Sequence, residues 1–329
     1  MLHKMNYAHG AIFGALCGDA AGAPLEFWKY TLTERIVQKA MWMPGGGALQ
    51  MGKGQVTDDG ELTMSLLTAL SSCGDTFDLN TIASKYIDWY NSHPFDIGRT
   101  TTQALSYGAK LIEEEGDEAL STLAAKMIKN SYKHNYYGAA NGALMRCTPI
   151  GVFGAKHLLP LDKVAEMAKQ DASLTHANPV CLDCSAVYSI LIYCLIIHPL
   201  DVAYAFQEAT AWAKKHACKE VWKWMELAQT ITDYNECLER IGFLKHGFVL
   251  ALFHLYHKTS YEEAISHTLL KGGDTDTNAC IVGGLMGCYW GMSGIPSFML
   301  DPVLHYSYSE DNGHLRPAWL HPIKVFKRV

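Results

Sequence analysis

Two short acidic motifs, far apart in the sequence, contain residue types that bind hard metal ions. Each follows glycine residues and opens a helix-like stretch, and the two motifs are Val56-Thr57-Asp58-Asp59-Gly60 and Gly272-Gly273-Asp274-Thr275-Asp276-Thr277-Asn278. Each supplies two carboxylates and at least one threonine hydroxyl, the oxygen ligands that Mg²⁺ and Mn²⁺ prefer. Four carboxylates brought into one cleft would repel one another and take up protons unless a cation held them. The pair therefore predicts one metal site built from both motifs.

The spacing of the aspartates suits an irregular helix entry. They are adjacent in the first motif and two positions apart in the second, so a regular helix would splay their side chains. At an irregular entry they could converge with the hydroxyls of Thr57 and Thr277 on two cations about 3.5 to 4 Å apart. The alternative is two capped helices, because Asp and Thr are favoured N-caps and carboxylates suit the positive end of a helix. Either motif alone favours the cap, whereas the matched pair favours the metal site.

The elements that must position these motifs are predicted to be helices. Apolar residues recur with helical spacing over much of the chain, namely over 79–90, 161–174, 185–197, 201–216, 241–257 and 261–270. Alternating runs typical of strands are scarce. Sequential helices joined by short polar or Gly/Pro segments pack against their neighbours. We therefore expect a single all-α domain over residues 1–329 with a binuclear metal cleft.

Two segments of small residues are expected to bring the acidic motifs together. Glycine recurs at every fourth position from Gly10 to Gly22. The segment 279–291 has a similar series, which consists of Gly283, Gly284, Gly287 and Gly291. A glycine inside a helix costs roughly 1 kcal/mol relative to alanine, so a series of them indicates that another backbone or a ligand lies close. Both helices are predicted to lie in the interior, with the metal motifs at their ends. The glycine-rich segment 44–55 leads into the first motif and is expected to form a mobile wall of the site.

The composition indicates a globular protein that binds neither nucleic acid nor membrane. The chain has 329 residues, 49% hydrophobic and 18% charged, with a formal net charge of -6 and no basic run apart from a short tail at 324–328. The apolar run 186–197 is too short for a membrane span and predicts a buried helix. The first residues lack the pattern of a signal peptide, so no export signal is expected. Ten scattered cysteines, including Cys181 and Cys184 in one helical turn, are typical of reduced core thiols, so we expect a cytoplasmic protein. We also expect a monomer.

Ordered motifs over nearly the whole chain resemble one enzyme family. They are Gly14-Ala15-Leu16-Cys17-Gly18-Asp19-Ala20-Ala21-Gly22-Ala23-Pro24-Leu25-Glu26-Phe27, Thr57-Asp58-Asp59, Asp96-Ile97-Gly98, Asn141-Gly142-Ala143-Leu144-Met145-Arg146, Leu174-Thr175-His176 and Gly273-Asp274-Thr275-Asp276-Thr277. In this respect the chain is similar to the ADP-ribosylglycohydrolases, which include the dinitrogenase reductase-activating glycohydrolase and the ADP-ribosylarginine and ADP-ribosylserine hydrolases. The resemblance implies an all-α fold with two divalent cations, Mg²⁺ or Mn²⁺. It also implies hydrolysis of the bond between ADP-ribose and an acceptor, on a modified protein or a small molecule.

The resemblance also assigns roles to individual residues. The implied metal ligands are Thr57, Asp58, Asp59, Asp274, Asp276 and Thr277; the implied catalytic carboxylates are Glu26 and Asp96; and the implied substrate-binding residues are Gly138, Ala139, Ala140, Asn141 and His176. The small residues of loop 138–142 would let backbone N–H groups approach a pyrophosphate. Asp96 could equally be an exposed cap, and a histidine before Asn178-Pro179 is more often a structural turn residue.

Other polar residues are predicted to be structural. Arg146 is expected to be buried and paired with a carboxylate. His246, His254 and His257 fall on a helical pattern without the glutamate of a zinc protease motif, so no ligand role is expected for them.

The sequence thus predicts a metal-dependent hydrolase that removes ADP-ribose from an acceptor. Arginine is slightly favoured as the acceptor, because Asp96 matches the dinitrogenase reductase-activating branch. Two other functions are consistent with the same residues: a catalytically silent ADP-ribose-binding or structural, crystallin-like protein, and a two-metal nucleotide phosphohydrolase.

Overall fold

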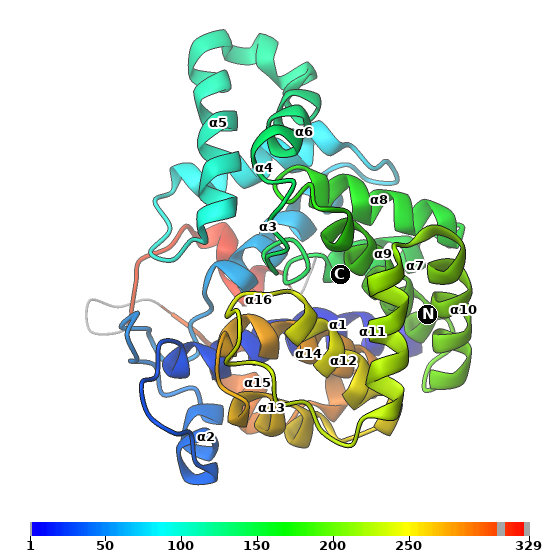
Figure 1. Cartoon of the computed structure of the whole chain (residues 1–329). Helices are drawn as coiled ribbons and strands as arrows, with labels where there is room; N and C mark the ends of the chain where they lie inside the picture. Colours follow the sequence, from blue (N-terminus) through cyan, green and yellow to red (C-terminus); the bar gives the residue numbers. More distant parts are fainter. Residues whose placement is uncertain (1, 308–312, 326–329) are drawn as a thin grey trace.

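The computed structural model describes residues 2–307 and 313–325, which form helices and no strand (Figure 1). Two isolated β-bridges join Gly46 to Met51 and Ala140 to Phe243. The α-helices are α1 (Leu2–Gly22), α2 (Glu34–Met41), α3 (Asp58–Ser72), α4 (Leu79–Asn91), α5 (Arg99–Glu115), α6 (Leu123–His134), α7 (Thr148–Lys156), α8 (Leu161–Ser173), α9 (Pro179–Ile197), α10 (Val202–His216), α11 (Lys219–Thr230), α12 (Lys245–His257), α13 (Tyr261–Leu270), α14 (Thr275–Trp290), α15 (Ser297–Leu304) and α16 (Pro322–Val325). The all-α prediction is confirmed.

Helices α1 and α14 lie antiparallel in the interior, and their backbones approach too closely for side chains to fit between them (Figure 1). A Cβ atom on Gly14 would lie 2.3 Å from the carbonyl oxygen of Gly283, and one on Gly287 would lie 2.2 Å from that of Gly10. Because these distances are far below van der Waals contact, the interface accepts only glycine at these positions. The predicted pair of small-residue helices is confirmed. The second acidic motif begins α14, as predicted, whereas the first begins a separate helix, α3.

Helix α9 forms a second buried layer beside this pair, with α7, α8 and α10 packed against it. In the described part of the chain, α9 is the one helix long and apolar enough to cross a membrane, and 83% of its most apolar window is buried inside the protein. Cys181 and Cys184 are buried on it, as predicted for core thiols. Its burial is that of a core helix.

A third group of helices projects from this core. Helix α3 packs against α1 and α4, and α4, α5 and α6 contact one another in the upper part of Figure 1. The N-terminus of α5 faces back toward the start of α3, because the backbone N–H of Gly98 donates to Asp58 Oδ2 at 3.3 Å. This contact brings the segment that contains Asp96 to the first acidic motif.

The structure differs from the sequence-based expectations in two places. Helix α12 begins at Lys245 and not near 241, because Arg240 and Gly242 have φ angles of 52° and 81°, which interrupt a right-handed helix. The segment 44–55 is fixed by hydrogen bonds: Gly54 N–H donates to the Met43 carbonyl at 3.1 Å, and Gly46 exchanges two backbone bonds with Met51. None of its residues lines the cavity described below, so the expectation of a site wall there was wrong.

Candidate active site

The two acidic motifs begin α3 and α14, as predicted, but their side chains do not cap these helices. Thr57 and Asp274 occupy the N-cap positions, and neither makes a side-chain capping bond. The Thr57 hydroxyl instead donates to Asp19 Oδ1 at 2.8 Å, and Asp274 Oδ2 accepts from Asn141 Nδ2 at 2.8 Å. The alternative of two ordinary helix caps therefore does not account for these side chains.

The two motifs meet although they lie more than 200 positions apart. Thr277 Oγ1 donates to Asp59 Oδ2 at 3.3 Å, and Thr57 Oγ1 lies 3.1 Å from the same oxygen. Both threonine hydroxyls thus converge on one carboxylate, as a site shared between the motifs requires. The antiparallel pairing of α1 with α14 makes this possible, because it places the start of α14 beside the end of α1 and next to α3.

Five acidic side chains form two overlapping clusters around Asp276. Carboxylate oxygens of Asp19, Asp59 and Asp276 lie within 4.8 Å of one another, and so do those of Glu26, Asp96 and Asp276. The predicted catalytic residues Glu26 and Asp96 are therefore brought to the predicted metal ligands. The geometry is that of a compact patch of oxygen donors supplied by four separate segments.

Asp19, for which the sequence analysis predicted no role, is the most deeply buried member of the cluster. Its carboxylate accepts from the Thr57 backbone N–H at 2.9 Å, from the Thr57 hydroxyl and from the Gly60 N–H at 2.8 Å. Asp19 lies on α1, yet it accepts hydrogen bonds from free backbone amides at the start of α3. In most helices a residue at the N-cap accepts these bonds. Burial nevertheless raises the pKa of Asp19 to about 7. The one feature of the sequence that could have indicated this role is the position of Asp19, a carboxylate among the small, apolar residues of α1.

Burial and mutual repulsion oppose the ionisation of the whole cluster. Burial, together with the nearby carboxylates, raises the pKa values of Asp58, Asp59 and Asp276 well above their ordinary range. Burial and the Asp96 charge raise the pKa of Glu26 to about 8. In the described structure, buried Asp59 Oδ1 and Glu26 Oε2 accept no hydrogen bond. Carboxylate oxygens that accept no hydrogen bond are free to coordinate a metal, and hard divalent cations prefer oxygen ligands. These residues therefore fit such an ion.

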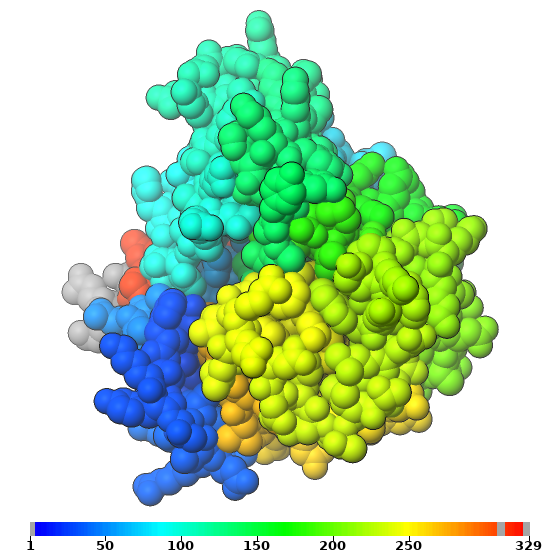
Figure 2. All heavy atoms as spheres, viewed as in Figure 1, coloured from blue at the N-terminus to red at the C-terminus, as the bar shows by residue number. Residues whose placement is uncertain are grey.

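A cavity of about 280 Å³ opens over this cluster. It is lined by Glu26, Asp58, Asp96, Gly98, Arg99, Thr100, Thr101, Ala140, Asn141, Gly142, Met145, His176, Ile241, Gly242, Asp274, Asp276 and Thr277. Thr57 and Asp59 lie buried beneath it, whereas Gly138 and Ala139 are outside its lining. Figure 2 shows the blue, cyan and yellow parts of the chain, which contribute to this lining, bordering one another on one face.

The predicted substrate loop is tied to the segment before α12. Asn141 N–H donates to the Gly242 carbonyl at 3.1 Å, and Leu244 N–H donates to the Ala139 carbonyl at 3.2 Å. The Asn141 side chain reaches Asp274, so this residue links the loop to the second acidic motif. The backbone N–H of Asn141 is therefore already engaged within the protein.

His176 lies in the cavity wall as a neutral side chain. Its Nδ1 is 2.7 Å from Thr175 Oγ1, and burial lowers its pKa to about 3. A Cβ atom on Gly142 would lie 3.0 Å from the His176 ring, so the glycine allows the ring to pack against this loop.

The other polar residues singled out in the sequence have partners away from the cluster. Arg146 is fully buried, donates to Asp171 Oδ2 at 3.3 Å, and lies over the Tyr86 ring, as predicted for a structural arginine. His246 contacts Tyr234 and the Glu239 carbonyl. These residues stabilise the scaffold.

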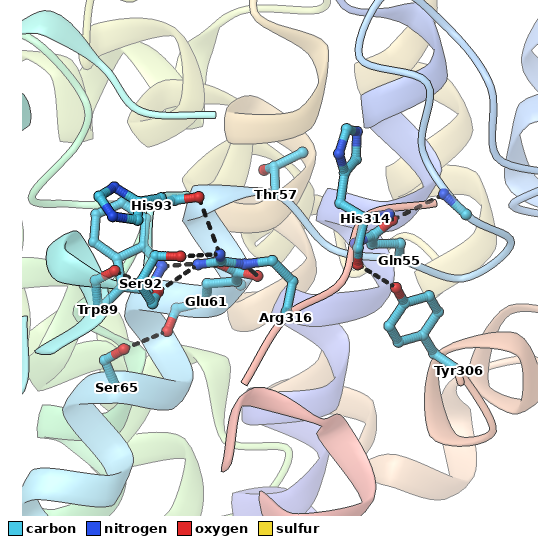
Figure 3. A network of polar contacts seen from close by, with 12 residues as sticks. Gln55, Thr57, Glu61, Ser65, Trp89, Ser92, His93, Tyr306, His314 and Arg316 are labelled. Carbon is cyan, nitrogen blue, oxygen red and sulfur yellow. Dashed lines mark hydrogen bonds and ion pairs between the residues drawn. The ribbon is translucent and has the colours of Figure 1, made fainter. Parts of the chain in front are cut away.

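A buried ion pair, which the sequence analysis missed, anchors the C-terminal segment beside the site (Figure 3). Arg316 Nε and Nη2 donate to the two oxygens of Glu61 on α3 at 2.8 and 2.9 Å. Arg316 Nη1 also donates to the Ser92 carbonyl at 2.9 Å, and Trp89 Nε1 donates to Glu61 Oε2 at 2.6 Å. Arg316 thereby joins the helix of the first acidic motif to the segment that leads to Asp96.

Comparisons with known proteins agree with this arrangement. The family model for ADP-ribosylglycohydrolase matches residues 3–321. A protein of Acanthamoeba polyphaga mimivirus that carries the name ADP-ribosyl glycohydrolase is 31% identical over 329 residues, covering 92% of each chain. The ADP-ribosyl-dinitrogen reductase glycohydrolase of Rhodospirillum rubrum is 28% identical over 303 residues, covering 90% of each chain.

Two further matches are more distant. An ADP-ribosylarginine hydrolase of Pseudomonas putida (strain GB-1) is 24% identical over 307 residues, covering 91% of this chain and 74% of its own. A solved structure described as an ADP-ribosylglycohydrolase-related protein complex shares the fold with a TM-score of 0.72 at 23% identity, covering 92% of this chain and 93% of its own. The family match over nearly the full length shows that the chain belongs to the ADP-ribosylglycohydrolase family of hydrolytic enzymes.

Proposed function

We propose that this protein is a metal-dependent hydrolase that cleaves the glycosidic bond between ADP-ribose and an acceptor. The observation that carries the proposal is the convergence of both acidic motifs with Glu26 and Asp96 at one cavity. The proposed ligands for two divalent cations, Mg²⁺ or Mn²⁺, are the carboxylates and threonine hydroxyls of the two motifs. When bound, the cations would grip the vicinal hydroxyls of the distal ribose and so fix its anomeric carbon.

The residues around the cluster supply the rest of the proposed chemistry. Cleavage passes through an oxocarbenium-like state, and the carboxylates of Glu26 and Asp96 face the cavity where they stabilise the developing positive charge. The Glu26 carboxyl group lines the cavity, where it could exchange a proton with water or the departing atom. We propose that one domain over residues 1–329 contains the complete site.

We propose an ADP-ribosylated protein as the substrate, with arginine as the favoured acceptor. The departing arginine side chain is a guanidine, and its cationic form suits a wall of carboxylates such as Glu26 and Asp96. The names of the Pseudomonas putida and Rhodospirillum rubrum relatives support arginine-linked and protein-linked ADP-ribose respectively. A serine acceptor, by contrast, leaves as an alkoxide and requires a proton donor or direct help from a metal.

Product analysis tests this proposal. The purified protein is incubated with Mg²⁺ and with matched peptides that carry ADP-ribose on arginine or on serine, and the products are separated. Release of intact ADP-ribose, faster from arginine, is expected. Release of AMP and ribose phosphate would identify a phosphohydrolase, and absence of any product would identify a silent binding protein. Faster release from serine would overturn only the acceptor assignment.

A further inference from the structure

Large aromatic side chains are exposed beside the cavity, outside its lining. Phe27 and Tyr30 are 63% and 79% exposed, and they follow Glu26, which lines the cavity. Trp28 lies between them, and its ring meets that of Tyr30 edge to face, with 6.3 Å between the centroids. A turn holds this segment at the cavity, because Trp28 N–H donates to the Leu25 carbonyl at 3.0 Å. Residues 27–30 thus form the surface next to a proposed catalytic carboxylate.

A second apolar segment meets the first. Leu238 is 71% exposed, and its Cδ2 would lie 3.2 Å from a Cβ atom on Gly272, while Leu32 Cδ1 would lie 3.7 Å from the same atom. The two leucines therefore lie close together over Gly272, at the beginning of the second acidic motif. Figure 2 shows the blue part of the chain, which contains residues 27–32, bordering the yellow part, which contains residue 238. We define the apolar rim as Phe27, Trp28, Tyr30, Leu32 and Leu238.

The backbone of the apolar rim is strained at Phe27. Its φ angle is 60°, in the left-handed region that bulky residues rarely adopt. Such strain persists only where the surrounding structure maintains it, and it is most frequent at functional sites. Exposed apolar side chains that lie together, and Trp and Tyr above all, are typical of surfaces that bind other proteins. The rim therefore has the composition of a docking surface.

The apolar rim lies on a positively charged segment of an acidic protein. The segment 27–42 contains the basic residues Lys29, Arg35 and Lys39 and one acidic residue, Glu34, whereas the whole chain has a net charge of -6. The three basic residues are exposed, and within residues 2–307 and 313–325 none of them forms an ion pair. Carboxylates on a bound partner would complement these charges. The charge therefore favours a partner with acidic residues at the point of contact.

We propose that the apolar rim binds the polypeptide of the substrate beside the arginine that carries ADP-ribose. This inference rests on the proposed function. ADP-ribose occupies the cavity whatever the acceptor is, so the rest of a modified protein lies outside the cavity, next to the bond that is cleaved. Glu26 faces that bond in the proposed mechanism, and the rim begins at the following residue, Phe27. The substrate segment that fits the rim has an apolar residue and a carboxylate close to the modified arginine.

Kinetics with three substrates that share one scissile bond test the proposal. The substrates are ADP-ribosyl-arginine itself, a peptide with leucine and aspartate beside the ADP-ribosylated arginine, and a peptide with serine and lysine at these positions. Trp28→Ser and Tyr30→Ser remove aromatic side chains from the apolar rim, and Lys29→Glu reverses a charge beside them. The matched control is Tyr256→Ser, because Tyr256 and Trp28 are 43% and 44% exposed and Tyr256 lies on α12, outside both the rim and the cavity.

The wild type should hydrolyse the leucine–aspartate peptide with a higher kcat/KM than the serine–lysine peptide. Trp28→Ser and Tyr30→Ser should each lower kcat/KM for the leucine–aspartate peptide about fivefold or more, through a raised KM, because Trp and Tyr supply much of the binding energy of interfaces. Lys29→Glu should reduce the difference between the two peptides. Turnover of ADP-ribosyl-arginine should stay within about twofold of wild type in every variant, which also shows that each variant is folded, and Tyr256→Ser should match the wild type with all three substrates.

Wild-type peptide kinetics in both Trp28→Ser and Tyr30→Ser would overturn the inference and leave the proposed function intact, as would equal hydrolysis of the two peptides by the wild type. Equal losses with ADP-ribosyl-arginine and with the peptide would assign the apolar rim to the chemical step and also overturn the inference. Sedimentation with phosphatidylserine vesicles and analytical ultracentrifugation test two other occupants. Vesicle binding or a dimer that Trp28→Ser abolishes, with peptide kinetics unchanged, would assign the rim to a membrane or to a second copy of the chain. A wild-type protein that hydrolyses none of the three substrates would overturn both proposals.

Discussion

At the scale of single residues, the site is defined by carboxylates that the fold keeps near one another despite their repulsion. Asp19 shows how this is arranged, since one buried carboxylate accepts from two backbone amides and one hydroxyl of the first motif. By accepting the Thr57 proton, it leaves a lone pair of that hydroxyl for another partner. Residues without direct contact with a substrate can thus determine which oxygen atoms are free to bind a cation.

The first prediction concerns the acidic motifs. Asp58→Asn and Asp276→Asn should each reduce turnover to background, because each removes an anionic ligand. Without added metal, both variants should be at least as stable to heat as the wild type, because a buried charge in a repulsive cluster is removed. Turnover assays with Mg²⁺ or Mn²⁺ and thermal unfolding in a chelator check the two parts. Wild-type turnover in either variant would exclude the metal proposal.

The second prediction separates chemistry from binding at Glu26. Glu26→Gln keeps the size and hydrogen-bonding capacity of the side chain but cannot exchange a proton. We expect kcat to fall by about 100-fold or more while the Kd for ADP-ribose changes little. Steady-state kinetics and calorimetric titration provide the comparison. Equal losses in kcat and affinity would show that Glu26 positions the substrate or metal.

At the scale of elements, the site depends on a segment far from it in sequence. Arg316 and Glu61 are almost fully buried and bind through two parallel hydrogen bonds (Figure 3). A buried ion pair adds little net stability, because desolvation offsets its attraction, but the loss of one partner leaves an uncompensated charge. The main effect of the pair is therefore to fix the position of α3 relative to the segment after α4. Its net contribution to the stability of the protein is small.

The third prediction follows from this contact. Arg316→Met should lower the free energy of unfolding by about 3 to 5 kcal/mol, because Glu61 stays buried without its cation. The double variant Arg316→Met with Glu61→Leu should recover most of that loss. Urea unfolding of the three proteins measures both values. A double variant as unstable as the single one would show that packing, and not the unpaired charge, dominates.

At the scale of the whole molecule, the parts that follow from local patterns could be predicted from the sequence. Apolar periodicity located helices such as α4, α8 and α13, and the glycine series identified the α1–α14 interface. The roles of Asp19 and Arg316 could not be predicted, because their partners lie 38 and 255 positions away. No local pattern distinguishes a carboxylate that binds a cation from one that accepts backbone amides.

The fourth prediction is a dependence of stability on pH in the metal-free protein. The pKa values of Glu26 and Asp19 are raised to about 8 and about 7, from ordinary values of 4.5 and 3.8. The folded state therefore binds more protons than the unfolded state over this interval, so stability is greatest below it and is lost as the pH rises toward about 8. Urea unfolding in a chelator at several pH values measures this slope. Added Mg²⁺ should flatten it, and a metal-free protein that gains stability as the pH rises would contradict the prediction.

The glycine interface between α1 and α14 also has a consequence for protein synthesis. The Thr275 hydroxyl donates to the carbonyl of Gly22, which the ribosome has joined to the chain 253 residues earlier. Until α14 emerges, the glycine face of α1 has no partner and the first acidic motif has no second half. A nascent chain therefore carries Asp58 and Asp59 through most of its translation without the residues that complete the site, and the enzyme is assembled only when its last long helix arrives.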